Sequence, residues 1–124
     1  MDIREKTIKK TRYITFVGIE MTDPAIPYPI TVQGFVDNAD KVFDLTYLDI
    51  NANEKGKGFG RQAIKKLAEI YDRINIYQTQ DQALMFWLAM YREKLVTSIH
   101  WDFDHLSMAQ RRVWNTLAGG VINP

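Results

Sequence analysis

Apolar and polar residues alternate along most of the first half of the chain, which is typical of strands with one buried face. Residues Lys9–Glu20 are rich in β-branched and aromatic side chains and predict a first strand. One face of this strand would carry Tyr13, Thr15, Val17 and Ile19. Ile30–Val36 and Val42–Ile50 predict two more strands, joined as a hairpin by the polar segment 37–40. Prolines 24, 27 and 29 exclude regular structure between the first and second strands.

The second half of the chain changes to a helical spacing of apolar residues. One stripe predicts a helix packed on a sheet, and it consists of Ala63, Ile64, Leu67, Ala68 and Tyr71. Ile74–Tyr77 predicts a short strand parallel to its predecessor, because a helix joins the two. Gln80–Leu95 predicts a second, more buried helix, and Val96–Phe103 predicts another strand. A capping-box pattern at residues 107–110 begins a last helix, which ends at residues 119–120.

These elements follow one another in the order βββαβαβα, which predicts the α/β (α+β) fold class with a mixed sheet. The chain has 124 residues, of which 46% are hydrophobic and 25% are charged. This composition suits one globular domain, spanning residues 1–124, with enough apolar material for a single core.

Composition narrows the possible function classes. The formal net charge of +1 gives no general attraction to nucleic acid, and the basic residues 4–12 are interpreted as a solvated strand edge. The lack of cysteine excludes a disulfide scaffold, a thiolate metal site and a cysteine nucleophile. No apolar run is long enough to cross a membrane, and the first residues are unlike a signal peptide. We therefore expect a cytoplasmic protein that binds neither nucleic acid nor membrane.

The segment Lys55-Gly-Lys-Gly-Phe-Gly60 lies between a predicted strand and a predicted helix. Backbone N–H groups at such a turn, with the positive end of the helix dipole, favour an anion such as phosphate. A nucleoside-triphosphate loop would need Lys-Ser/Thr after the last glycine, where this chain has Arg61 and Gln62. A dinucleotide loop would need its last glycine one residue later and an acidic residue about 20 positions further on. The alternative without a ligand is a tight strand-to-helix turn.

The same segment, with Leu48-Asp-Ile50 before it, resembles the Arg/Gln-x-x-Gly-x-Gly/Ala signature of the GNAT superfamily of N-acetyltransferases. Lys55 stands where that family usually has Arg or Gln, and it keeps a cation there. The resemblance implies that the loop binds the pyrophosphate of acetyl-CoA and that the strand end pairs with the pantetheine arm. The cofactor-binding residues that it implies are Leu48, Ile50, Lys55, Gly56, Lys57, Gly58, Phe59, Gly60, Arg61 and Gln80.

A second stretch, Gln80-Asp-Gln-Ala83-Leu-Met-Phe86-Trp87, is similar to the family's Asn-x-x-Ala-x-x-Phe/Leu-Tyr pattern. Gln80 keeps an amide side chain for the pantetheine. Trp87 replaces the tyrosine that often protonates the leaving thiolate, and an indole N–H cannot act as an acid near neutral pH. Tyr91, one turn further on the same helical face, is the candidate for that role.

The resemblance further implies direct attack of an amine on the acetyl thioester. A carboxylate on the strand before the loop commonly serves as base, and Asp44 lies about there, with Asp49 as the other choice. A bulge would be needed to present Asp44, and its other interpretation is a hydrogen-bonded or exposed strand residue. The backbone N–H near Leu48 is the expected oxyanion donor. His100, Asp102 and Asp104 share one strand face, but this alternation is usual in half-buried strands, so we expect no metal site.

Two functions remain open. The first is an acetyl-CoA-dependent N-acyltransferase acting on an amine of a small molecule, peptide or protein. The second is a catalytically reduced GNAT-like domain that works in binding, regulation or structure. The two helices that normally follow the family's first strand are missing, and the expected sheet has helices on both faces. The last helix, which carries Trp114, would cover the core or form a partner surface, such as a homodimer contact.

Overall fold

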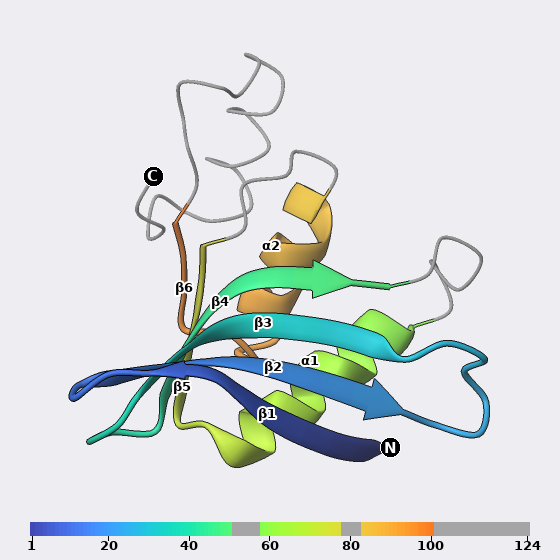
Figure 1. Cartoon of the computed structure of the whole chain (residues 1–124). Coiled ribbons are helices and arrows are strands. Elements are labelled where there is room, and N and C mark those ends of the chain that lie inside the picture. The colour runs from blue at the N-terminus through green and yellow to red at the C-terminus, as the bar shows by residue number, and fades with distance from the viewer. Residues whose placement is uncertain (51–57, 78–82, 101–124) are drawn as a thin grey trace.

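Residues 1–50, 58–77 and 83–100 are described by the computed structural model, and they form a six-stranded sheet with two helices (Figure 1). The first part contains β1 (Asp2–Lys10), β2 (Ile14–Thr22), β3 (Ile30–Asp37) and β4 (Val42–Asp49). The second contains α1 (Phe59–Ile70), β5 (Arg73–Ile76), α2 (Leu84–Arg92) and β6 (Ser98–Ile99). The strands lie in the sheet in sequence order. Strands β1 to β4 are antiparallel neighbours and β4, β5 and β6 run parallel, so the fold is a mixed α+β one.

A turn at residues 11–13 splits the first predicted strand in two. The N–H and the hydroxyl of Thr11 both donate to the carbonyl oxygen of Ile14, at 2.9 and 2.8 Å. The prediction of one strand over Lys9–Glu20 is therefore wrong, because a threonine that favours strands can also close a turn with its hydroxyl. The predicted strand edge is confirmed for β1, which is the outer strand and is mostly exposed.

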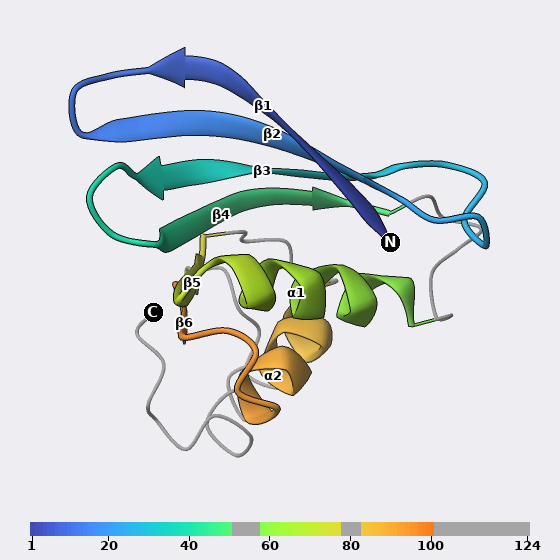
Figure 2. The ribbon, with the colours of Figure 1, turned by 90° about the horizontal axis from the view of Figure 1, so that it is seen from below.

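Both described helices lie on the same face of the sheet (Figure 2). The connections from β4 to β5 and from β5 to β6 advance in the same direction, and right-handed crossovers then place both helices on one side. The expectation of helices on both faces is not met by α1 and α2. The predicted helix from residue 107 and the strand residues 101–103 lie outside the described residues.

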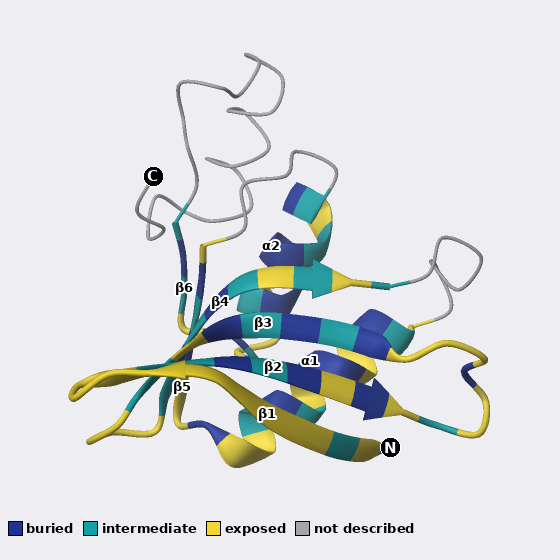
Figure 3. Ribbon diagram, viewed as in Figure 1, coloured by how far each residue is buried: buried dark blue, intermediate teal, exposed yellow. Residues whose placement is uncertain are grey.

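Alternate strand residues form the core beneath this helical layer (Figure 3). The covered face of the sheet is almost completely buried, and its side chains include Val17, Ile19, Met21, Val32, Phe43, Leu45, Ile74 and Ile76. The helices contribute Ala63, Ile64, Leu67, Leu84, Trp87 and Leu88 to the same hydrophobic cluster. Because strand side chains alternate, the residues between them, Asp44 among them, face the opposite side, where none of the described helices covers them. We call this side the open face.

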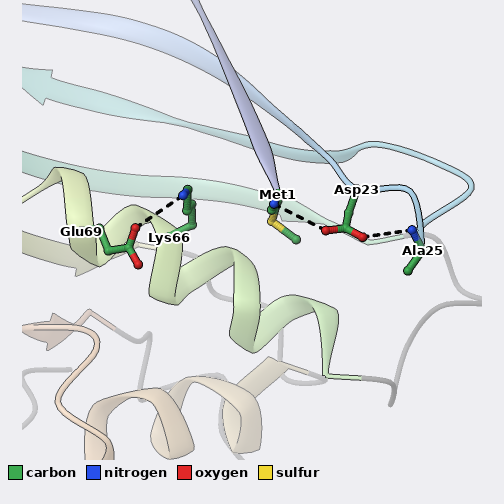
Figure 4. A network of polar contacts seen from close by, with 5 residues as sticks. All are labelled: Met1, Asp23, Ala25, Lys66 and Glu69. Carbon is green, nitrogen blue, oxygen red and sulfur yellow. Dashed lines mark hydrogen bonds and ion pairs between the residues drawn. The ribbon is translucent and has the colours of Figure 1, made fainter.

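Two polar contacts tie the edges of the fold together. In residues 23–29, which we call the proline segment, the Asp23 carboxylate accepts from the Ala25 N–H at 2.9 Å. It also lies 3.5 Å from the Met1 amino group (Figure 4). After α1, the Tyr71 hydroxyl donates to Glu5 of β1 at 3.2 Å. Burial, followed by the charge of Glu5, raises the pKa of Tyr71, so this hydroxyl stays protonated as a donor. The edge strand is thereby connected to the helical layer.

The central position of α1 generates a stability prediction. Leu67 is 0% exposed, and Leu67→Ala should lower the free energy of unfolding by about 2–5 kcal/mol because it leaves a cavity. Ile70 on the same helix is 42% exposed, and Ile70→Ala should change that free energy by only about 0.5 kcal/mol. Chemical denaturation of both variants measures the difference, and equal losses would contradict the assigned buried face.

Candidate functional site

β4 carries a bulge close to Asp44. Gln33 pairs with Tyr47 while the next residue, Gly34, pairs with Leu45, so Thr46 is the extra residue. The Thr46 hydroxyl donates to the carbonyl oxygen of Gln33 at 3.3 Å. A bulge, which the catalytic interpretation of Asp44 requires, is therefore present in this strand, and such a bulge bends and twists the strand that contains it.

Gly34 allows β3 and β4 to approach closely beside the bulge. A Cβ atom at this position would overlap the carbonyl oxygen of Asp44 and lie 2.7 Å from the Phe43 ring. Only a glycine fits there without moving the backbone of β4. Gly34 thus fixes the position of Asp44 relative to the sheet.

β4 and β5 diverge just beyond Asp44. Their ladder covers Val42–Leu45 and Arg73–Ile76, and it is continued by a bond of 2.8 Å from the Tyr77 N–H to the Leu45 carbonyl oxygen. β4 runs on to Asp49 beside β3, and Figure 1 shows it bending away from β5. Asp44 therefore lies on the open face next to the point of divergence.

A row of polar side chains crosses the open face from β4 to β6. The Asn75 amide nitrogen donates to the Asp44 carboxylate at 3.0 Å, and the Ser98 hydroxyl donates to the Asn75 amide oxygen at 2.7 Å. Nε2 of His100 lies 3.2 Å from the Ser98 oxygen. The register of the parallel strands explains this row, because Asp44 pairs with Asn75 and Asn75 pairs with Ser98. We call these four residues the polar chain.

Tyr77 lies at the end of the polar chain. Its ring stacks on the imidazole of His100, with centroids 4.3 Å apart and planes 1° from parallel. Burial, and then the negative charge of Asp44, raise the pKa of Tyr77. Its hydroxyl therefore remains a proton donor at neutral pH.

The N-terminal end of α1 provides a second polar feature. Its N-cap, Gly58, has φ 82° and ψ 6°, a left-handed conformation that glycine adopts without strain, and no side chain caps the helix within the described residues. The first turn also contains no acidic side chain. The N–H groups of a first turn have no partner inside the helix, so this end favours an anion.

Several residues predicted to bind the cofactor have packing roles here. A Cβ on Gly60 would lie 2.8 Å from Cδ1 of Ile50 and 3.1 Å from the Phe86 ring, so Gly60 lets α1 approach the end of β4 and α2. Leu48, Ile50 and Phe59 are partly buried against the core. The structure thus brings Ile50 and Gly60 together at the start of α1.

Arg61 is held by Glu93, which follows α2. The Glu93 carboxylate oxygen lies 2.6 Å from one terminal nitrogen of Arg61 and accepts from its Nε at 2.7 Å. Hydrogen bonding and charge attraction lower the pKa of Glu93 and raise that of Arg61. Because both groups are well exposed, the pair contributes little to stability. The ion pair does set the direction of the Arg61 guanidinium in the protein without a ligand.

The remaining predicted residues are separated from the polar chain or undescribed. Tyr91 is partly buried on α2, on the covered face, and no hydrogen bond or ring contact joins it to Asp44 in the described chain. Trp87 is completely buried in the core. Lys55, Gly56, Lys57 and Gln80 lie outside the described residues.

The open face also contains a hollow over β1, β2 and β3, with a volume of about 510 Å³. Its lining mixes charges of both signs with uncharged residues and includes Arg4, Lys6, Ile8, Glu20 and Gln33. None of the polar chain lines it. Over residues 1–50, 58–77 and 83–100, no group of three or more His, Cys, Asp or Glu side chains is arranged to hold a metal ion.

Sequence reasoning did not identify Asn75, Tyr77 or Ser98, and it considered His100 only as a metal ligand. A signal for Asn75 was present, because it is a polar residue between Ile74 and Ile76 in a strand expected to be buried. No signal linked it to Ser98, since their contact depends on the order of strands in the sheet.

Comparison of the chain with protein-family models, curated proteins and solved structures gave no match. None of the helices in the described part of the chain is both long and apolar enough to span a membrane.

The close approach at Gly34 can be tested against a second strand glycine. Gly34→Ala should lower the free energy of unfolding by about 1–3 kcal/mol or more, because the new methyl group overlaps the backbone of Asp44. At Gly18 an added Cβ would meet only the flexible side chain of Ile8, with Cδ1 nearest at 3.4 Å, so Gly18→Ala should be neutral or slightly stabilising. Denaturant unfolding measures both. A Gly34→Ala protein as stable as Gly18→Ala would refute the geometry described for β4.

Proposed function

We propose that this protein is an acetyl-CoA-dependent N-acyltransferase of the GNAT type, which transfers an acetyl group to an amine of a small molecule, peptide or protein. The observation that carries the proposal is the bulged β4, which leaves its parallel neighbour, together with the start of α1, where Gly58 is left-handed and no described side chain caps the helix. The sequence motif at residues 55–60 supports it independently.

Each end of acetyl-CoA has a chemical counterpart in this arrangement. The pyrophosphate suits the N-terminal end of α1, where backbone N–H groups and the helix dipole favour negative charge. Lys55 and Lys57 of the preceding segment would add positive charge. The pantetheine amides suit the edge of β4 where it has left β5, because an extended arm can pair with a strand edge. Leu48 lies at this end of β4, and Ile50 follows directly after the strand.

The thioester would then lie near the divergence of β4 and β5. Asp44 is located on the open face at that point, joined to three further polar residues. An acyl transfer needs groups that accept the proton of the amine and donate one to the thiolate. The polar chain would supply the proton acceptor, and the protonated Tyr77 hydroxyl would supply the donor.

The proposal includes the GNAT topology, in which the β1–β2 hairpin and the proline segment take the place of the missing helices. It also includes a cytoplasmic setting, because acetyl-CoA is a metabolite of the cell interior.

A reduced GNAT-like domain that binds without catalysing is the second candidate function, and two observations favour it. Trp87, at the position of the family's acidic tyrosine, is 0% exposed and forms part of the core. Arg61, in the proposed phosphate loop, is paired with Glu93. Trp87 thus serves the core, and the Arg61 guanidinium is already engaged by Glu93 in the free protein.

Calorimetric titration with acetyl-CoA tests the cofactor, using two nearly isosteric variants. Asn and Asp both tolerate the left-handed backbone of Gly58, so Gly58→Asn and Gly58→Asp differ mainly by one negative charge. Wild type should bind near micromolar affinity, and Gly58→Asp should bind at least about tenfold more weakly than Gly58→Asn, because its carboxylate repels the pyrophosphate.

A thermal shift with millimolar CoA provides a second readout of binding. No heat and no thermal shift with wild type would refute the proposed cofactor. Equal affinities of the two variants would show that acetyl-CoA binds somewhere other than the start of α1. Binding without acetyl transfer to any amine would favour the second candidate function.

A further inference from the structure

The hydrogen bonds of the polar chain have one consistent direction. An ionised carboxylate only accepts hydrogen bonds, so the Asn75 atom 3.0 Å from Asp44 is the amide nitrogen. The Asn75 oxygen then faces Ser98 and accepts its hydroxyl proton across 2.7 Å. Every donor in the row therefore points toward Asp44.

This direction determines which ring nitrogen of His100 carries a proton. The Ser98 hydroxyl has a single proton, and it is given to Asn75. Nε2 of His100, 3.2 Å from the Ser98 oxygen, must therefore be the donor in that contact. A neutral imidazole protonated on Nε2 has its lone pair on Nδ1. No hydrogen bond to Nδ1 exists within the described residues.

Three contacts hold the side chain and the backbone of His100 in place. Its Nε2 is bonded to Ser98, its face is stacked on Tyr77 at 4.3 Å, and the His100 backbone N–H donates to the Ile76 carbonyl oxygen at 2.7 Å. The side chain is half-buried at the carboxyl end of β6. Among residues 1–50, 58–77 and 83–100, Asp44 and Tyr77 are the titratable groups at this end of the open face.

We propose that Nδ1 of His100 is the proton-accepting atom of this site, and that Asp44 is a positioning residue acting through Asn75 and Ser98. This inference rests on the proposed acyl transfer. The acceptor nitrogen attacks the carbonyl carbon of the thioester, so a C–N bond forms and the C–S bond breaks. The sulfur leaves with the electron pair and takes a proton from the Tyr77 hydroxyl, which regains one from solvent. The proton lost by nitrogen goes to Nδ1 of His100 and from there to solvent.

The chemistry of the two groups explains this division of roles. An imidazole exchanges protons near neutral pH without any special environment, whereas a carboxylate needs one to act as a base there. Asp44 is instead engaged as the acceptor for Asn75. Its charge polarises the hydrogen bonds of the row and keeps the donors of Asn75 and Ser98 directed toward it.

Nitrogen-detected NMR of the imidazoles tests the proton assignment in the free protein. The chain has two histidines, His100 and His105, so the spectrum of a His100→Gln variant assigns the signals. His100 should show the tautomer with its proton on Nε2. Ser98→Ala should give a mixture of tautomers, and Ser98→Thr, which keeps the hydroxyl, should restore the single form. A proton on Nδ1 in wild type would overturn the inference.

Kinetics of acetyl transfer with one fixed amine acceptor test the division of roles. His100→Gln should lower kcat/KM by about 100-fold or more and remove the rise of rate with pH that a deprotonated base produces. Asp44→Asn still accepts from Asn75, so it should lose only about tenfold in kcat/KM and keep the rise of rate with pH. The opposite pattern, in which Asp44→Asn loses the rise and His100→Gln keeps it, would identify Asp44 as the base.

Binding measurements separate failure of this inference from failure of the proposed function. Both variants should bind acetyl-CoA as wild type does, since neither residue touches the proposed phosphate site. A wild-type protein that does not bind acetyl-CoA would refute the acyl transfer, and the NMR tautomer would still decide which atom of His100 accepts protons.

Discussion

The burial of one face of the sheet is the constraint on which the other features of the molecule depend. On β4 and β5, the buried side chains of Phe43, Leu45, Ile74 and Ile76 anchor the strands beneath the helices. Since successive side chains alternate, Asp44 and Asn75 have to face the other side. A slip of one residue would place a carboxylate in the core and four apolar side chains outside it, at a large cost in free energy. The core therefore positions the polar chain.

The departure of β4 from β5 depends on two small residues and one extra residue. Thr46 supplies the bulge, and Gly34 lets the backbone of Asp44 come close to β3. Gly60 then lets α1 pack against Ile50 at the end of the same strand. Glycine in a strand or helix interior costs stability because it loses more conformational freedom on folding. The geometry between the polar chain and the start of α1 is thus maintained at the expense of some stability.

Two residues show that a match to a motif does not by itself give a side chain the role that the motif implies. Trp87 falls in register with a catalytic position of the family that the sequence resembles, yet its side chain is entirely enclosed by the core. Arg61 follows the glycine motif, yet its guanidinium is paired with Glu93 in the free protein. Conversely, His100 belongs to no motif, and it acquires a defined hydrogen-bonding role only through its neighbours in the sheet. Proximity in the fold, more than position in a motif, decides which of these polar groups contact one another.

The sequence by itself determined the elements whose periodicity is strong. The alternation of β3 and β4, the apolar stripe of α1 and the parallel pairing of β5 were all predictable, because burial imposes a repeat of two or 3.6 residues on the chain. It did not determine the β1–β2 hairpin, since an edge strand with one neighbour needs little hydrophobic character and the threonine hydroxyl that closes its turn has no periodic signal. Only the tertiary structure decided that Asp44, Asn75, Ser98 and His100 form one row. Asn75 contacts Ser98 and Asp44, which are 23 and 31 positions away from it, and strand order and register, not local propensity, bring such residues together.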